Sequence, residues 1–265
     1  NFYPYGSMTV GCGGTQIAEI GGMARAGIVG ISDGDYPIAD AHLMRNVFLY
    51  SLMFGLPVIT HCEDKSISAG GVMNEGAVSV CLGLKGIPRE AEEVMVARNL
   101  ILAGATGARL HIVHVSTKDS VELIRNAKKR GVNVTCETCP HYFLLTEEAV
   151  GDYNTLAKVD PPLRTDEDVR AILEAIADGT VDVISSGHSP VGLEYKRLEF
   201  DKAAWGISSI ETALALSYTK LVGEAVIPID RLAEKMSGAP ARILGLAGKG
   251  SIEPGFDADF TILET

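Results

Sequence analysis

Three short runs of β-forming residues end in a histidine followed by small or polar residues, and this feature constrains the fold more than any other. The runs span residues 57–64, 110–116 and 181–190, and they carry His61, His114 and His188. In α/β barrels the carboxyl ends of parallel strands deliver their side chains to one face of the sheet. The pattern therefore predicts a single metal or acid/base centre assembled from separated strand ends.

Helical patterns alternate with strand-like runs along the chain. The expected helices span residues 39–54, 88–103, 118–130, 166–178, 209–222 and 228–236. This alternation predicts a parallel sheet, and ligand-type residues at strand ends favour a TIM-type (β/α) barrel over a doubly wound sheet. About six strand–helix units are visible, fewer than the eight that a closed barrel needs. We therefore expect an incomplete α/β barrel.

The composition excludes several classes of function. The 265 residues are 46% hydrophobic, which is ample for a core, and the net charge is −11. The longest basic run is 128–130, so neither nucleic acid nor an anionic membrane is an expected partner. No apolar run is long enough to span a bilayer, and the first residues lack a basic signal-peptide region. These features predict a cytoplasmic protein.

The cysteines predict reduced thiols. The five cysteines are odd in number and scattered. Cys136 and Cys139 have the spacing of a redox or zinc pair, but no second pair accompanies them and the first lies inside a predicted strand. We therefore expect both to be packed thiols.

Several motifs in order resemble the dihydroorotases. These belong to the metal-dependent cyclic amidohydrolase superfamily, which also contains hydantoinases and allantoinases. The matching stretches are residues 61–64, 82–88, 114–118, 140–141, 158–164 and 255–260. The runs at 136–142 and 188–190 are more similar to those of allantoinases. The resemblance covers essentially the whole chain and implies an amidohydrolase-type barrel, with allantoinase- or hydantoinase-type activity as an alternative.

The resemblance implies reversible hydrolysis of dihydroorotate to carbamoyl aspartate, a step of pyrimidine biosynthesis, by a zinc-bound hydroxide. His61 and His114 occupy the metal-histidine positions of the family. The loop at Trp205 and Gly206 resembles the one that contacts substrate, and Asp160 replaces a substrate-contacting asparagine. An aspartate at that position would repel an anionic substrate.

Some positions depart from the family pattern. The carboxylate that helps to hold the metals after the fourth strand of the family barrel falls at Gly34, although Asp33 and Asp35 flank it and are predicted substitutes. The catalytic aspartate falls at Gly187, so no catalytic side chain is predicted, and a substrate-contacting histidine falls at Val191. The first two strands of the family barrel, with their metal-binding His-x-His pair, are expected to be absent.

Two hypotheses follow. The first is a dihydroorotase-like hydrolase of impaired activity that acts on a small cyclic amide. The second is a non-catalytic homologue that serves as a structural partner of aspartate carbamoyltransferase. We expect a barrel domain over residues 1–249 and the start of a small β domain over 250–265. Open sheet edges would favour self-association, so a homo-oligomer is expected.

Overall fold

The computed structural model describes residues 2–264 and contains a six-stranded sheet whose paired strands are all parallel. The strands lie in the order β1-β2-β3-β6-β7-β8, which is also their order along the chain. Their bounds are β1 Tyr5–Gly6, β2 Gly30–Ile31, β3 Val58–His61, β6 Leu110–Val113, β7 Val134–Thr138 and β8 Val183–Ile184. The six predicted units are therefore present. Within residues 2–264 no strand pairing joins β1 to β8, and self-association through these edges stays a prediction.

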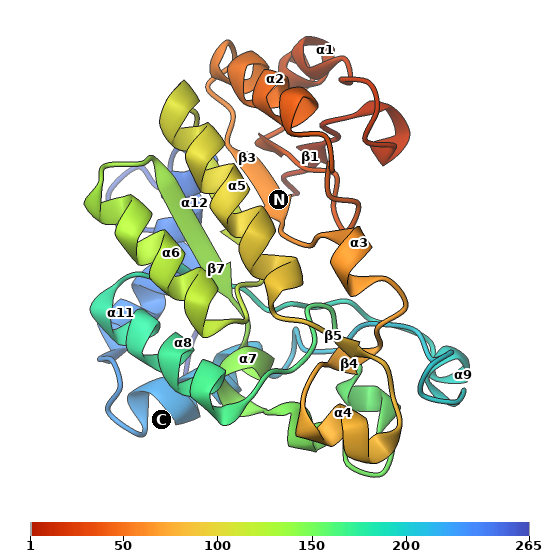
Figure 1. Ribbon diagram of the computed structural model, residues 1–265. Coiled ribbons are helices and arrows are strands. Elements are labelled where there is room, and N and C mark those ends of the chain that lie inside the picture. The colour runs from red at the N-terminus through yellow and green to blue at the C-terminus, as the bar shows by residue number, and fades with distance from the viewer. Residues whose placement is uncertain (1, 265) are drawn as a thin grey trace.

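Helices follow most strands and cover the outer face of the sheet. Figure 1 shows α5, α6 and α8 lying side by side, and α2 packs against α5. These helices are α2 Ala41–Leu52, α5 Glu90–Thr106, α6 Lys118–Lys129 and α8 Asp166–Asp178. Their buried faces meet aliphatic strand residues such as Val58 and Ile112 in one hydrophobic core. This burial of one helix face against a sheet stabilises the α/β layers.

Helix starts follow local side-chain chemistry. Asp168 accepts hydrogen bonds from the backbone and the hydroxyl of Thr165, and these contacts cap the start of α8. At α6 the Thr117 hydroxyl accepts from the Ser120 backbone N–H, so residues 117 and 120 form the cap of this helix. The Ser116 hydroxyl instead donates to Glu92, far away in the sequence.

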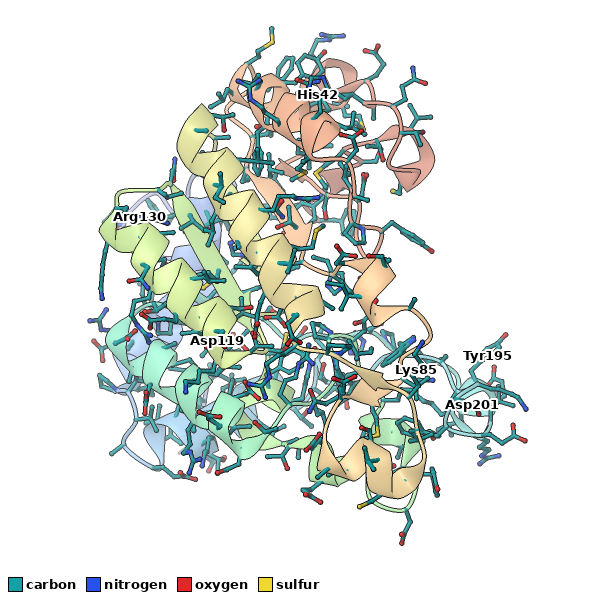
Figure 2. The ribbon with its side chains drawn as sticks, in the orientation of Figure 1. His42, Lys85, Asp119, Arg130, Tyr195 and Asp201 are labelled. Carbon is teal, nitrogen blue, oxygen red and sulfur yellow. The ribbon has the colours of Figure 1, made fainter. Side chains whose placement is uncertain are left out.

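The remaining elements are short. A two-stranded sheet of β4 Met73–Asn74 and β5 Gly86–Ile87 lies beside α4 Ala77–Leu82 (Figure 1). The segment with α9 projects away from the sheet, and Tyr195 and Asp201 mark its outer surface (Figure 2). The other helices are α1 Ile20–Arg25, α3 Lys65–Ser68, α7 Pro140–Leu144, α9 Leu193–Lys196, α10 Ala213–Ser217, α11 Ile229–Ala233 and α12 Ala239–Leu244, with π-helical turns at Tyr218–Val222 and Glu234–Gly238 and 3₁₀ turns at Val10–Cys12, Glu147–Val150 and Thr155–Ala157.

The C-terminal segment differs from the expectation. Residues 250–264 form neither helix nor strand, so the β character predicted for this stretch is not observed there. Residues 1 and 265, the outer ends of the two predicted domains, lie outside the described residues. The predicted domain division at residue 249 stays a prediction.

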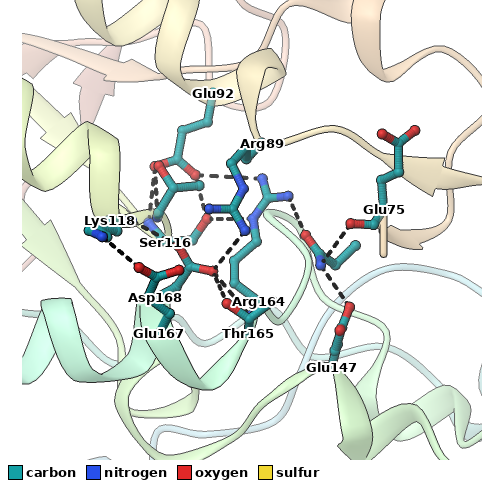
Figure 3. A network of polar contacts seen from close by, with 12 residues as sticks. Glu75, Arg89, Glu92, Ser116, Lys118, Glu147, Arg164, Thr165, Glu167 and Asp168 are labelled. Atoms are coloured by element: carbon teal, nitrogen blue, oxygen red, sulfur yellow. Dashed lines mark hydrogen bonds and ion pairs between the residues drawn. The ribbon is translucent and has the colours of Figure 1, made fainter. Parts of the chain in front are cut away.

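A buried arginine forms hydrogen bonds with several of the loops above the sheet (Figure 3). Arg164 donates to the Ser116 hydroxyl, the Asn74 side chain and the Ile87 carbonyl at 3.2, 2.9 and 3.1 Å. Its Nη2 lies 3.8 Å from Glu92 Oε2, and both side chains are almost fully buried. Glu92 in turn accepts from the backbone and hydroxyl of Ser116. The network therefore joins α5, the β6–α6 loop, the small sheet and the loop before α8.

Arg164→Leu tests this network. The substitution leaves the Glu92 carboxylate buried without its cation, so we expect the free energy of unfolding to fall by about 3–5 kcal/mol. The matched control is Arg170→Leu, because Arg170 pairs with Asp166 on the exposed face of α8. That pair contributes about 0.5 kcal/mol or less. Equal losses for the two variants in urea unfolding would contradict the role given to Arg164.

Candidate active site at the strand ends

Two of the three predicted histidines come together. His61 is the last residue of β3 and His114 follows β6, and because these strands are paired their rings lie 5.9 Å apart between centroids. Burial lowers the pKa of His114 to about 4, and the neighbouring His61 acts in the same direction. His114 is therefore neutral at physiological pH, which is the form that binds metals.

His188 lies apart from this pair and has a structural contact. Its exposed ring accepts hydrogen bonds through Nδ1 from the backbone N–H groups of Ser209 and Ile210 at 3.1 and 3.2 Å. The ring therefore holds the start of the segment that leads into α10. The three-histidine centre suggested by the strand ends is reduced to His61 and His114.

Acidic side chains surround His61. Its Nε2 lies 3.2 Å from Glu63 Oε2, and Glu63 also binds the Lys65 ammonium. Lys65 Nζ is 3.9 Å from Asp160 Oδ2. One ligand-type atom from each of His61, Glu63 and Asp160 lies within 4.8 Å of the others. These three residues line a pocket together with Arg164 and Glu92.

The charges of this cluster perturb one another. Burial alone would lower the pKa of His61, but the hydrogen bond with Glu63 and the charge of Asp160 raise it. Burial alone would raise the pKa of Glu63, but contacts with His61 and Lys65 lower it to about 2. Burial and the nearby Glu63 raise the pKa of Asp160, against the effects of His61 and Lys65. Such mutual shifts are typical of functional sites.

The two aspartates predicted as substitute metal ligands are placed differently. Asp33 is buried and accepts from the backbone N–H groups of Met8 and Thr9 at 2.6 and 3.0 Å, and from the Thr9 hydroxyl. Its oxygens are engaged in holding the N-terminal segment, so this geometry does not support a ligand role. Asp35 is exposed, and its charge raises the pKa of His61 and opposes the lowering of the pKa of His114.

The predicted substrate-contacting loop lies against the segment that carries Asp160. The Gly206 N–H donates to the Lys158 carbonyl at 3.0 Å. The Lys158 ammonium lies 4.8 Å from the Trp205 ring centroid and donates to the carbonyls of Phe200 and Asp201. Asp160, Trp205 and Gly206 therefore belong to one interlocked region, while their contact with substrate stays a prediction.

The position of the family's catalytic aspartate is closed by neighbouring side chains. Gly187 has a φ of +61°, and a Cβ placed there would lie 2.6 Å from His141 Cε1 and 2.7 Å from Cys139 Sγ. Cys139 and Cys136 are buried free thiols, as expected, and burial raises the pKa of Cys136 to about 12. No side chain reaches the site from position 187.

Sequence reasoning missed two carboxylates. Glu63 lies two residues after His61, a spacing at which extended chain directs both side chains to one face. Glu137 lies in β7, where its Oε2 is 3.2 Å from His111 Nε2 and its Oε1 accepts from the Ser185 hydroxyl at 2.8 Å. Side chains of a strand alternate between its two faces, so Thr135 and Glu137 of β7 lie on the same face. Because Thr135 pairs in register with His111, this alternation could have predicted that Glu137 lies near His111.

These contacts show whether the predicted ligands can form the family's metal centre. His61 and His114 are close enough to share an ion, but within residues 2–264 no third His, Cys, Asp or Glu completes a ligand group with that pair. Zinc sites in proteins use at least three protein ligands. The predicted set of His61, His114, Asp33 and Asp35 therefore does not fit a metal centre in this arrangement.

Comparisons with known proteins identify the family. Residues 16–265 match the model of the amidohydrolase family, and the chain therefore belongs to it. It is 52% identical over 264 residues to a dihydroorotase of Acetivibrio thermocellus and 53% identical to one of Pelotomaculum thermopropionicum. Each alignment covers 100% of this chain and 62% of the relative. The chain thus spans about three fifths of the length of these relatives, and the predicted resemblance to dihydroorotases is confirmed.

A solved structure supports the predicted fold class. L-hydantoinase from Arthrobacter aurescens aligns with a TM-score of 0.83 at 28% identity, covering 98% of this chain and 60% of that one. The α/β, TIM-type class is therefore confirmed, while closure of the barrel is not observed. Of the helices formed by residues 2–264, none is both long and apolar enough to cross a membrane.

Gly187→Ala tests the closed position. We expect a loss of about 2–3 kcal/mol in the free energy of unfolding, because positive φ is unfavourable for alanine and the added methyl overlaps His141 and Cys139. Gly34→Ala is the matched control, since Gly34 has a φ of +59° and no atom lies within 4 Å of the place that a Cβ would take there. It should lose about 1 kcal/mol. Equal losses in denaturant unfolding would show that position 187 is not sterically closed.

The buried His141 predicts a specific pH dependence. Burial lowers its pKa to about 3, and its Nδ1 has no hydrogen-bond partner among residues 2–264. Between pH 3 and pH 6.5 the unfolded chain therefore binds more protons at this residue, so stability falls as the pH falls. From pH 7 to pH 5 the native protein should lose about 2 kcal/mol more than His141→Gln in urea unfolding. Identical losses would contradict this assignment.

Proposed function

We propose that this chain is a dihydroorotase-like cyclic amide hydrolase with a reduced rate. The observation that carries the proposal is the His61–His114 pair, placed on neighbouring strand ends of a chain that is about half identical to dihydroorotases along its whole length. The pocket beside this pair is lined by His61, Glu63 and Asp160 together with Glu92 and Arg164.

The reduced rate follows from position 187. Hydrolysis of a cyclic amide needs a proton at the leaving nitrogen, and a positioned acid contributes about 10²–10⁴-fold to such a step. Gly187 has no side chain to supply this proton, and His141 and Cys139 occupy the adjacent space. In the family, zinc polarises the amide carbonyl and activates water. Zinc is the metal that the resemblance to dihydroorotases predicts, although the predicted ligands His61, His114, Asp33 and Asp35 do not form a metal centre in this arrangement.

Turnover of dihydroorotate and of carbamoyl aspartate by the purified chain, with zinc supplied, tests the proposal. We expect a kcat about 10²–10⁴-fold below that of the similar Acetivibrio thermocellus dihydroorotase, because one proton-transfer group is missing. His61→Asn should abolish the remaining turnover. His42→Asn is the matched control, since His42 is exposed on the outer face of α2 (Figure 2). Dihydrouracil is a cyclic amide without the carboxylate of dihydroorotate. Faster hydrolysis of dihydrouracil than of dihydroorotate would favour the hydantoinase-type alternative.

A second candidate function rests on the closed position at Gly187. A chain that cannot place the catalytic aspartate is suited to a structural role, and the expected partner is an aspartate carbamoyltransferase. Absence of turnover in both directions, by a folded chain with stoichiometric zinc, would contradict the hydrolase proposal. Co-elution with an aspartate carbamoyltransferase in a sizing experiment would then support the structural role.

A further inference from the structure

We infer that the outer face of α5 is a self-association surface, on which a second copy of this chain packs with its own α5 antiparallel. The face consists of Val94, Ala97, Ile101 and Gly104, here called the α5 strip. Spacings of three, four and three residues place them on one side of the helix and are typical of helices that pack in pairs. Val94, Ile101 and Gly104 are exposed, and Ala97 is half-buried.

The α5 strip lacks the charges that a solvent-facing helix normally carries. Between residues 94 and 106 the only charged residue is Arg98, and its guanidinium donates to two backbone carbonyls just before α2. Ile101 is 68% exposed and Val94 is 48% exposed. A helix that is apolar on all sides is normally covered on all sides. The outer face of α5 therefore fits a protein partner better than water.

The neighbouring helix α2 adds apolar surface. It packs against α5, and its Leu49 and Leu52 are 39% and 43% exposed. Helix α6, on the other side of α5, carries the polar residues Glu122, Asn126 and Lys129 on its exposed face. Figure 1 shows the three helices in one layer with α5 in the middle. An exposed apolar residue that stands alone needs no explanation, whereas a group on two packed helices indicates an interaction surface.

Charges beside the α5 strip are segregated along its length. The starts of α5 and α6 carry Glu90, Glu93 and Asp119, and the end of α6 carries Lys129 and Arg130. Figure 2 shows Asp119 and Arg130 at opposite ends of α6. Among residues 2–264, the ion pairs of α5 and α6 use other side chains of these helices. The acidic end and the basic end are therefore both available to a partner.

The acidic end carries negative charge that this chain does not balance. One carboxylate oxygen of Glu93 is buried and has no hydrogen-bond partner in the described part of the chain. Burial raises the pKa of this carboxyl, and the charges of Asp119 and Glu92 raise it further. A positive charge supplied by a partner would stabilise these carboxylates.

A second copy supplies that charge only in the antiparallel arrangement. A two-fold axis that crosses α5 between Ala97 and Ile101 places the acidic end of each copy against Lys129 and Arg130 of the other. Each contact then occurs twice, as in any two-fold pair. A parallel arrangement would bring like charges together at both ends. The net charge of −11 opposes contact between copies elsewhere on the surface, so this complementary face is favoured.

The experiment is sedimentation velocity of the full chain over a range of concentrations, in which we expect a monomer–dimer equilibrium. Ile101→Lys should raise the dimer dissociation constant at least about 30-fold, because each copy would place a charge at the centre of the interface. Ile229→Lys is the matched control, since Ile229 is 50% exposed on α11, and it should leave the constant unchanged. Urea unfolding of each variant confirms that it is folded.

Charge reversal tests the antiparallel arrangement. Asp119→Lys and Arg130→Glu should each raise the dissociation constant about 5–10-fold, because an attraction that occurs twice becomes a repulsion. The double variant carries the same contacts with their signs exchanged. It should therefore associate within about 2-fold of the native chain.

Three outcomes would overturn the inference. A chain that stays monomeric at every concentration has no such surface. Association that Ile101→Lys and Ile229→Lys weaken equally, or that neither weakens, lies elsewhere, as at the open edges of β1 and β8. A double charge variant that associates as weakly as the single variants excludes the antiparallel arrangement. None of these measurements depends on hydrolysis of a cyclic amide, so this inference and the proposed function can fail separately.

Discussion

The buried contact between Arg164 and Glu92 is the interaction on which the arrangement above the sheet depends. Removing two charges from water is costly, and the cost is offset only when each charge also finds hydrogen bonds. Arg164 donates to Ser116, Asn74 and the Ile87 carbonyl, and Glu92 accepts from Ser116 and Thr117. Segments far apart in the sequence thus share one set of partners (Figure 3). Because few alternative partners exist for these charges, the network fixes how the loops dock.

The fixed loop determines the electrostatics of the pocket. Arg164 anchors the segment that carries Asp160, and the Lys158 ammonium anchors its other end through the carbonyls of Phe200 and Asp201. Asp160 therefore stays near His61 although burial raises its pKa and disfavours its charge. The network that lines one side of the pocket therefore keeps a carboxylate oxygen of Asp160 within 4.8 Å of a ring nitrogen of His61. A flexible loop would let Asp160 move into solvent.

Local patterns predicted the fold and the placement of two site residues, while long-range contacts decided the rest. Strand ends placed His61 and His114, and the helix expected over residues 166–178 is observed as α8, because these features depend on neighbouring residues. The role of Asp33 depends on donors from Met8 and Thr9, which no local pattern reveals. The closure at Gly187 likewise depends on His141 and Cys139, residues of another strand end. Glu63 was predictable from its spacing to His61, because alternate residues of an extended chain lie on one face.

The departures from the family pattern at Gly34, Gly187 and Asp160 all change the negative charge available in the site. A divalent ion in a partly buried site needs anionic ligands to offset the water that it loses. The family-like pair of His61 and His114 offers none, since both candidate carboxylate positions are glycines and Asp33 is engaged elsewhere. Glu63 and Asp160 together offer two negative charges beside His61. The Lys65 ammonium, which binds Glu63 and lies 3.9 Å from Asp160, offsets these charges in the structure, so the acidic side of the pocket is balanced by a side chain of this chain.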